Sequence, residues 1–505
     1  MSTTHRQDEA SERSPLLDGH RLEAGDDYDQ TPSTKSTNDF PNDAFEISLG
    51  TELKVLARYS GPLALTYFIQ FGFQMVVILV ASQLSTDELA GVSLGITTAN
   101  IIGYAIFEGM ATCLDTLCSQ SYGSGRLSEV GLHTIRFTIF VHIVAIPIAL
   151  LWLFSEQILR ALVPSEELAA HAGTFLRYSL IGIPGYASFE AGKRFLQAQG
   201  NFTGGLYTLV VCLPVTFVLT YALVITADMR VAGAALAASL TNLLRPLLLA
   251  SYSLFINRST LQCWPSASEV RRSWNKDYYA MLPLAAAGTV TTLSEWLSFE
   301  ILTFSLTYLG NAALAAQVYL SSTVNLVWHI PFAMSIAGST RIGNLVGIGL
   351  IRLTTLRIML WYFFAFLISA VLNVLLGGAV IMLMLGYLIH DEAVASIVRD
   401  NLIWMLIFAF FDALANWPHC VVRGIGWQNI SACVTAGVSY LYSVPLALYL
   451  ELGPPDMGIT GLWIGLGSGV ALVTGMESLI VWMKLRKNSD ECLKDYSDVD
   501  QSLED

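Results

Sequence analysis

Long apolar segments, separated by short polar or charged stretches, fill most of this chain. A helix of about 20 mainly apolar residues crosses the hydrocarbon core of a bilayer with its backbone hydrogen bonds satisfied internally. The pattern therefore predicts twelve membrane-spanning helices. Their expected ranges are 58–83, 88–117, 130–154, 171–192, 204–226, 231–256, 278–307, 311–340, 354–386, 397–421, 430–451 and 459–484.

Basic residues are distributed unevenly between the two ends of these segments. If the N-terminus is cytosolic, 17 Lys and Arg residues lie at cytosolic helix ends and loops, against four on the opposite side. Cytosolic loops of membrane proteins are enriched in Lys and Arg, so this asymmetry predicts that both termini are cytosolic. The N-terminus lacks the pattern of a cleaved signal peptide, and we expect the first helix to act as the insertion signal.

The two halves of the chain share landmarks at a spacing of roughly 220 to 230 residues, which indicates a parallel internal repeat. For example, Pro62–Ala64 in the first segment matches Pro283–Ala285 in the seventh. Chance recurrence of proline and small residues is the alternative explanation. The repeat predicts an all-α membrane protein of twelve transmembrane helices in two pseudo-symmetric six-helix bundles, 51–256 and 278–487, joined by a cytosolic loop at 257–277.

Composition supports a polytopic membrane protein, with 54% hydrophobic and only 13% charged residues. The formal charge of −13 comes entirely from the two ends: residues 1–50 carry 11 acids and 4 bases, and residues 488–505 carry 7 acids and 1 base. These polar, acidic tails are expected to be disordered in the cytosol, and nucleic acid is not an expected partner. The seven cysteines lack the spacings of a zinc site or disulfide framework, so no metal or cofactor is predicted.

Six acidic residues of the predicted membrane segments are taken as candidates for mechanism, because an unpaired carboxylate there costs at least about 2.5 kcal/mol. They are Glu108, Asp115, Glu190, Glu295, Glu300 and Asp412. Glu190 precedes Lys193 and Arg194 by three and four residues, so a local ion pair is expected. Asp115 lies near a helix end within reach of the same bases and is expected to be structural. The role of Glu108 stays open.

Glu295 and Asp412 are the best functional candidates because both lie near mid-membrane without a base within helical reach. Such carboxylates are suited to binding and releasing protons near neutral pH. Glu300 is rotated by roughly 140° from Glu295 along the helix, so the two need not share a wall. Candidate cavity-lining side chains are Asn325, Trp328, Asn416, Trp296 and Glu108. For Trp328, ordinary interhelical packing is the alternative. Arg245, inside the sixth segment, could either snorkel to the interface or pair with an acid such as Glu108.

Several motifs together resemble the multidrug and toxic compound extrusion (MATE) family, in its eukaryotic and fungal branch. The resemblance covers roughly residues 50–485 and rests on Asp115–Gln120 with Tyr122–Gly123, Lys193–Gln199, Glu295–Glu300, Ser339–Asn344 and Val422–Gly424. Within these motifs we expect structural roles for Asp115, Gln120, Lys193, Arg194, Gln197, Arg341 and Arg423.

The resemblance implies a V-shaped cavity between two lobes, alternating access, and export of organic, often cationic, compounds against entering protons. It makes Glu295, Asp412 and Glu300 the proton and cation sites of the second lobe. The first-helix aspartate of some prokaryotic members has no counterpart, since residues 59–83 contain neither Asp nor Glu. Sodium coupling is therefore a less favoured alternative. A monomer in the lipid bilayer, carrying a small organic substrate and protons, is the expected unit.

Two other classes of protein are weighed against an exporter. A lipid-linked oligosaccharide flippase of the same superfamily needs a strongly cationic cavity for pyrophosphate, whereas the mid-membrane charges here are mostly acidic. An intramembrane enzyme needs a converging nucleophile, base or metal set, and no such motif is found, so no enzymatic activity is predicted.

The N-terminal tail contains one possible address signal. Glu12 lies four residues before the Leu16-Leu17 pair, the form of an acidic dileucine sorting signal. This motif favours the vacuolar membrane, with the plasma membrane as the alternative, and implies a sorting adaptor as a partner. Short patterns of this kind also arise by chance in polar tails.

Overall fold

The computed structural model describes residues 48–504 except 164, 277 and 350–353, and side chains are described as far as residue 486. Within this part the chain is helical, and helices occupy all twelve predicted positions. The first half contains α1 (Leu49–Ala81), α2–η2–α3 (Thr86–Ala99, Asn100–Tyr104, Ala105–Gly123), α4 (Leu127–Leu153), α5 (Ser155–Leu162), α6–η3–α7 (Glu166–Ser179, Leu180–Gly182, Ile183–Ala198), α8–η4 (Thr203–Tyr221, Ala222–Thr226) and α9–η5 (Arg230–Ser251, Tyr252–Ile256). The second half contains η6 (Arg258–Cys263), α10 (Ala267–Ser273), α11–η7 (Tyr278–Ser305, Leu306–Leu309), α12 (Asn311–Gly347), α13 (Thr354–Tyr387), α14 (Glu392–Ile425), α15–η8–α16 (Gln428–Val438, Ser439–Ser443, Val444–Leu452) and α17 (Ile459–Glu504).

Nine of the helical segments in the described residues are long and apolar enough to cross a membrane by composition alone. The three other predicted spans are α6–η3–α7, α11 and α12. The first is interrupted by a 3₁₀ turn before Pro184, a residue that favours the start of a helix. Helices α11 and α12 carry many polar residues, which lowers their mean hydropathy while they remain continuous helices.

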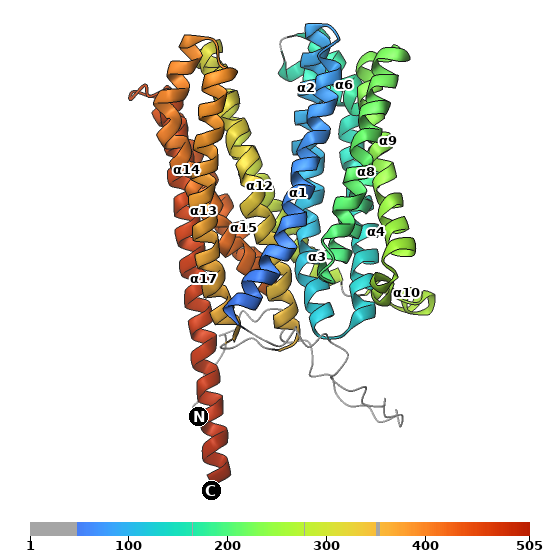
Figure 1. Ribbon diagram of the computed structural model, residues 1–505, viewed down its shortest axis with the longest axis vertical. Coiled ribbons are helices and arrows are strands. Elements are labelled where there is room, and N and C mark those ends of the chain that lie inside the picture. Colours follow the sequence, from blue (N-terminus) through green and yellow to red (C-terminus); the bar gives the residue numbers. More distant parts are fainter. Residues whose placement is uncertain (1–47, 164, 277, 350–353, 505) are drawn as a thin grey trace, which may run out of the picture.

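The helices form two lobes that lie side by side and spread apart at one end (Figure 1). Helix α1 begins and α17 ends at the opposite end, which we call the tail side. Helix α1 leans across the lobes. Its Leu56 packs in the second-lobe cluster with Ile342 and Tyr362, whereas Val77 packs with Phe175 of the first lobe. The overall shape is the V that the resemblance implies.

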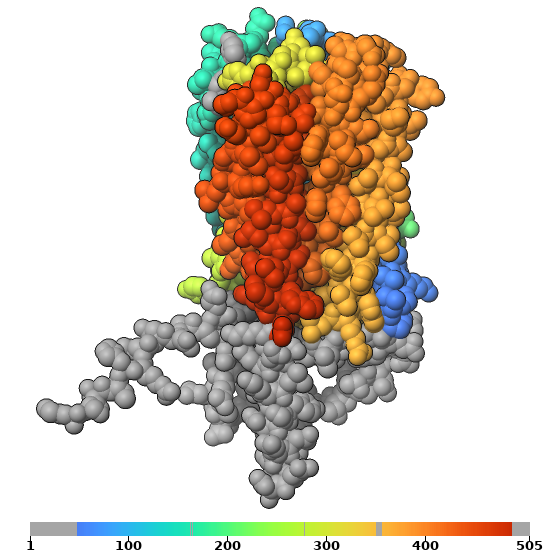
Figure 2. All heavy atoms as spheres, turned by 90° about the vertical axis from the view of Figure 1, so that its left-hand side faces the viewer, coloured from blue at the N-terminus to red at the C-terminus, as the bar shows by residue number. Residues whose placement is uncertain are grey.

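The outer surface of the second lobe is apolar, as a lipid-facing surface requires. Figure 2 shows this face, along which α17 runs as a continuous ridge beside α13 and α14. Large side chains on it remain exposed, among them Phe364 and Ile368 of α13 and Trp482 of α17. Because lipid tails are as apolar as these side chains, their exposure carries no cost in a bilayer.

The ends of the chain differ from the sequence-based expectation. Helix α1 begins at Leu49, nine residues before the predicted start, because the Ser48 hydroxyl caps it by accepting a hydrogen bond from the Thr51 amide. The segment 488–505 was predicted to be disordered, but α17 continues through it to Glu504. This segment has neither Gly nor Pro, so nothing in its sequence terminates the helix.

Candidate functional site

The second lobe brings two carboxylates from two helices against one histidine, and a third carboxylate lies within electrostatic range of them. Glu295 of α11 and Glu477 of α17 flank His419 of α14: Oε1 of Glu295 lies 3.8 Å from Nδ1, and Oε2 of Glu477 lies 3.1 Å from Nε2. Asp412, also on α14, is close enough to interact electrostatically with Glu295 and His419. The structure therefore places Glu295 and Asp412 at one site.

His419 and Glu477 are the members of this site that the sequence-based prediction missed. The expectation concerned bases within helical reach on the same helix, and the structure adds His419 of α14 beside Glu295 across the helix interface. His419 follows Asp412 by seven residues, two helical turns, and therefore lies on the same face of α14. Glu477 is fully enclosed, and the Thr435 hydroxyl donates a hydrogen bond of 3.4 Å to its Oε1.

Access to the site is through Glu295. Its side chain keeps 40% of its surface exposed, whereas that of His419 keeps 13% and that of Glu477 none. The imidazole of His419 thus lies between an accessible carboxylate, Glu295, and an enclosed carboxylate, Glu477.

The other predicted second-lobe residues have different surroundings. Glu300 is half-buried, and no charged side chain of the described residues acts on it, so it lies outside the cluster. Asn416 donates its amide hydrogen to the Asp412 carbonyl of its own helix at 2.9 Å. Trp328 stacks on Phe332 with ring centroids 4.2 Å apart. Asn325 is exposed and Trp296 half-buried.

Polar side chains of each lobe bind backbone groups of the other lobe on the tail side. Gln120 of α3 donates hydrogen bonds to the carbonyls of Gly424 (3.0 Å) and Ile425 (3.1 Å). The Thr116 hydroxyl donates to the Arg423 carbonyl, and Gln428 of α15 donates to the Thr112 carbonyl at 3.0 Å. We call this set the tail-side latch; its members are Thr112, Thr116, Gln120, Arg423, Gly424, Ile425 and Gln428. Each bond contributes a net of about 0.5–1.5 kcal/mol, so the latch is strong only as a set.

Glycines allow the backbones to meet at the latch. A Cβ on Gly288 of α11 would lie 2.0 Å from Thr112 Oγ1 and 2.4 Å from the Gly109 carbonyl oxygen. A Cβ on Gly123 would lie 2.0 Å from the Asn344 carbonyl oxygen of α12. Any larger residue at these positions would force the lobes apart on the tail side.

Asp115 lies between basic residues of both lobes. Its Oδ1 is 3.5 Å from Nε of Arg194 in the first lobe, and its Oδ2 is 3.8 Å from Arg423 in the second. Arg194 and Lys193 also hold Glu190, with Lys193 Nζ 2.8 Å from Oε1, so the predicted local pair is present. The motif residue Gln197 is buried further along α7.

Arg341 has a partner that the sequence did not reveal. Its Nε donates a hydrogen bond of 3.0 Å to Glu52 in the first turn of α1, and Tyr362 donates to the same carboxylate at 3.5 Å. Glu52 is completely buried. This pair attaches the start of α1 to the second lobe.

In the first lobe, Glu108 and Arg245 have different partners and do not form an ion pair. Glu108 accepts a hydrogen bond of 2.5 Å from the Tyr186 hydroxyl. Arg245 is 6% exposed, lies over the Phe73 ring at 4.4 Å, and has no acidic partner among the described residues. Both earlier suggestions for Arg245 are therefore wrong: it neither snorkels nor pairs with Glu108, because the aromatic face supplies a cation–π contact instead.

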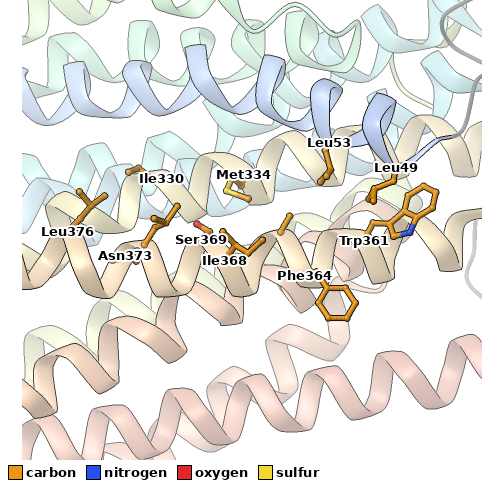
Figure 3. Close-up of a pocket in the computed structure, with 12 residues that line it drawn as sticks. Leu49, Leu53, Ile330, Met334, Trp361, Phe364, Ile368, Ser369, Asn373 and Leu376 are labelled. Atoms are coloured by element: carbon orange, nitrogen blue, oxygen red, sulfur yellow. The ribbon is translucent and has the colours of Figure 1, made fainter.

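A cavity between α1, α12 and α13 does not contain this chemistry. It has a volume of about 560 Å³ and is lined almost wholly by apolar side chains such as Leu53, Met334 and Phe364 (Figure 3). Because it opens on the apolar outer face, it is suited to lipid hydrocarbon and not to a cation. Within the described residues, no three His, Cys, Asp or Glu side chains are placed to hold a metal ion.

These features define a class of protein. Helices long and apolar enough to cross a bilayer form two lobes, and carboxylates are buried between the helices of one lobe, as in membrane transporters. The MatE family model matches the chain twice, over residues 62–222 and 289–449. The chain belongs to the MatE family. The two matches start 227 residues apart, which agrees with the repeat spacing predicted from the sequence.

Similar proteins come from fungi and plants. The uncharacterized transporter YDR338C of Saccharomyces cerevisiae is 36% identical over 90% of this chain and 67% of its own length. Protein DETOXIFICATION 16 of Arabidopsis thaliana is 28% identical over 90% of this chain and 95% of its own length.

Solved structures share the fold. The crystal structure of the eukaryotic MATE transporter AtDTX14 superposes with a TM-score of 0.78 at 24% identity, covering 88% of this chain and 99% of that one. An outward-facing conformation of a multidrug resistance MATE family transporter superposes with a TM-score of 0.77 at 17% identity, covering 86% and 96%.

Proposed function

We propose that this protein is a secondary active exporter that exchanges protons for organic, often cationic, compounds. The observation that carries the proposal is the cluster of Glu295, Asp412 and Glu477 around His419, open at Glu295. A cation attracted by an ionised carboxylate competes with a proton for the same oxygen, so one site can hold either but not both. This competition is the basis of exchange.

The tail-side latch supports alternating access, the second part of the proposed function. With both termini in the cytosol, the tail side is the cytosolic side, and the lobes are joined there and spread apart on the opposite side. The present arrangement then accepts protons from the outer side and releases substrate to it. Breaking the tail-side latch while the outer ends close would turn the site toward the cytosol, giving alternating access within one monomer.

Proton-coupled exchange can be tested with purified protein in liposomes carrying an imposed pH gradient. We expect several organic cations to move against the proton gradient, with a matching change of internal pH. A sodium gradient that drives the same flux at constant pH would favour sodium coupling. Folded protein that moves no cation would contradict the proposal and favour an anionic or lipid substrate, as in a flippase.

We propose the vacuolar membrane as the location, on the basis of Glu12, Leu16 and Leu17, which lie outside the described residues. Replacing Leu16 and Leu17 by alanine should move a fluorescently tagged protein from the vacuolar to the plasma membrane, because a sorting adaptor would lose its contact. Replacing Leu22, a tail leucine outside the motif, serves as the control. An unchanged location of the dileucine variant would contradict this role.

A further inference from the structure

His419 and Glu477 are buried titratable groups that simple competition at Glu295 and Asp412 does not require. The imidazole bridges the accessible and the enclosed carboxylate, with 3.8 Å from Nδ1 to Glu295 Oε1 and 3.1 Å from Nε2 to Glu477 Oε2. An ionised Glu477 needs a counter-ion because it is completely enclosed, and the Thr435 hydroxyl alone is a weak one. His419, 3.1 Å from Oε2 of Glu477, would be that counter-ion when it is protonated.

We propose that His419, anchored by Glu477, is a built-in cation that occupies Glu295 in the absence of substrate, and that substrate binding releases its proton as a second exchanged proton. The inference rests on the proposed cation–proton exchange and specifies its stoichiometry. An organic cation that reaches Glu295 places a second positive charge beside the imidazolium. At about 4 Å, two unit charges repel by about 4 kcal/mol at an effective dielectric constant of 20.

The proton balance of this step is simple. The Nδ1–H bond of His419 breaks, and the proton leaves to water along the exposed side of Glu295. A monovalent substrate replaces this charge beside Glu295. The first proton of the exchange leaves the Asp412 carboxyl group, which ionises, so the two protons released carry one more positive charge than the substrate brings. Neutral His419 keeps its proton on Nε2, the nitrogen that lies 3.1 Å from Oε2 of Glu477. His419 is thus a positioning residue that loses its positive charge when the substrate cation binds.

The helices around His419 supply no other group for this role. Glu295 faces it from α11 and Glu477 from α17, while Asp412 and Arg423 lie on its own helix. On α12, Arg341 is paired with Glu52 and His329 stacks on Phe68. The charged residue of α13 from 354 to 387 is Arg357, which is exposed, and α15 has no charged residue. The Tyr362 hydroxyl of α13 donates to Glu52, and Cys433 of α15 is exposed. Asp115 of α3 reaches Arg423 and not the histidine.

The test is the pH dependence of cation affinity. Tetraphenylphosphonium, whose charge does not titrate, is bound to the purified full-length protein in detergent between pH 5.5 and 8.5. For each proton released on binding, the Kd falls by about tenfold when the pH rises by one unit. At the acidic end, we expect the Kd of the wild type to fall by nearly a hundredfold for each pH unit. The Kd of His419→Gln should fall by tenfold per pH unit. The control His142→Gln on α4 should show the same pH dependence of Kd as the wild type.

The outcomes separate the inference from the proposed function. A hundredfold dependence that persists in His419→Gln, or a tenfold dependence in the wild type, would overturn the second proton site alone. Wild-type binding without pH dependence would overturn the proposed exchange as well. If His419→Gln does not fold, Glu477→Gln provides the second test: loss of the anchor should reduce the dependence toward tenfold, and an unchanged dependence would overturn the inference.

Discussion

Replacing Glu295 by glutamine together with Asp412 by asparagine is expected to abolish proton-coupled cation transport. The amides keep the shape of the side chains but remove the charges that attract a cation and bind a proton. Loss of a carboxylate about 4 Å from a bound cation removes about 4 kcal/mol of attraction at an effective dielectric constant of 20, roughly a thousandfold in affinity. The measurement is substrate uptake by liposomes under a fixed pH gradient.

Glu300→Gln is the matched control for this pair. Glu300 lies on the same helix as Glu295, but no charged group of the described residues acts on it, so its amide variant should transport at near the wild-type rate. Transport and pH dependence that survive in a normally folded Glu295→Gln/Asp412→Asn variant would contradict the assigned site. Equal losses in the Glu300→Gln variant would show that the effect is not specific to the cluster.

Replacing Arg341 by methionine is expected to lower the free energy of unfolding by about 3–5 kcal/mol, because it leaves a buried carboxylate without its counter-ion. Glu52 is completely buried, and Arg341 binds it through two guanidinium nitrogens. Thermal unfolding in detergent measures the effect. Since Glu52 stands in the first turn of α1, the attachment of this helix to the second lobe should also loosen.

Two further variants serve as a control and a rescue for Arg341→Met. Arg357→Met removes an exposed base from α13 and should change the free energy of unfolding by no more than about 0.5 kcal/mol. Adding Glu52→Gln to Arg341→Met should recover much of the lost stability, because the stranded charge disappears. An Arg341→Met variant as stable as Arg357→Met would show that the buried pair does not hold α1.

The sequence predicted the helices and two of the three acids of the cluster for identifiable reasons. Apolar segments of sufficient length identify the membrane-spanning helices. Glu295 and Asp412 stand out because a carboxylate within such a segment costs free energy. Glu477 also lies within a predicted span, but its importance depends on α17 meeting α14, which periodicity along one helix does not reveal. The spacing of His419 from Asp412 was a usable signal, since seven residues return to the same face of a helix.

The latch illustrates what the sequence could not provide. Gln120 and Thr116 were recognisable as motif residues, but their partners are carbonyl groups of residues 423–425, and a carbonyl is present whatever the side chain. Glu52 was overlooked because an acid just before an apolar segment usually faces water. Its burial follows from the arginine that α12 brings to it.

The most direct test of cation–proton exchange counts the protons released when a cation binds. Calorimetric titration of the purified protein with tetraphenylphosphonium near pH 6, in buffers of different ionisation enthalpy, gives this number without a membrane or a gradient. Exchange predicts at least one proton released per cation by the wild type, and neither binding nor release by Glu295→Gln/Asp412→Asn. Cation binding without proton release, or unchanged release from the double variant, would contradict it.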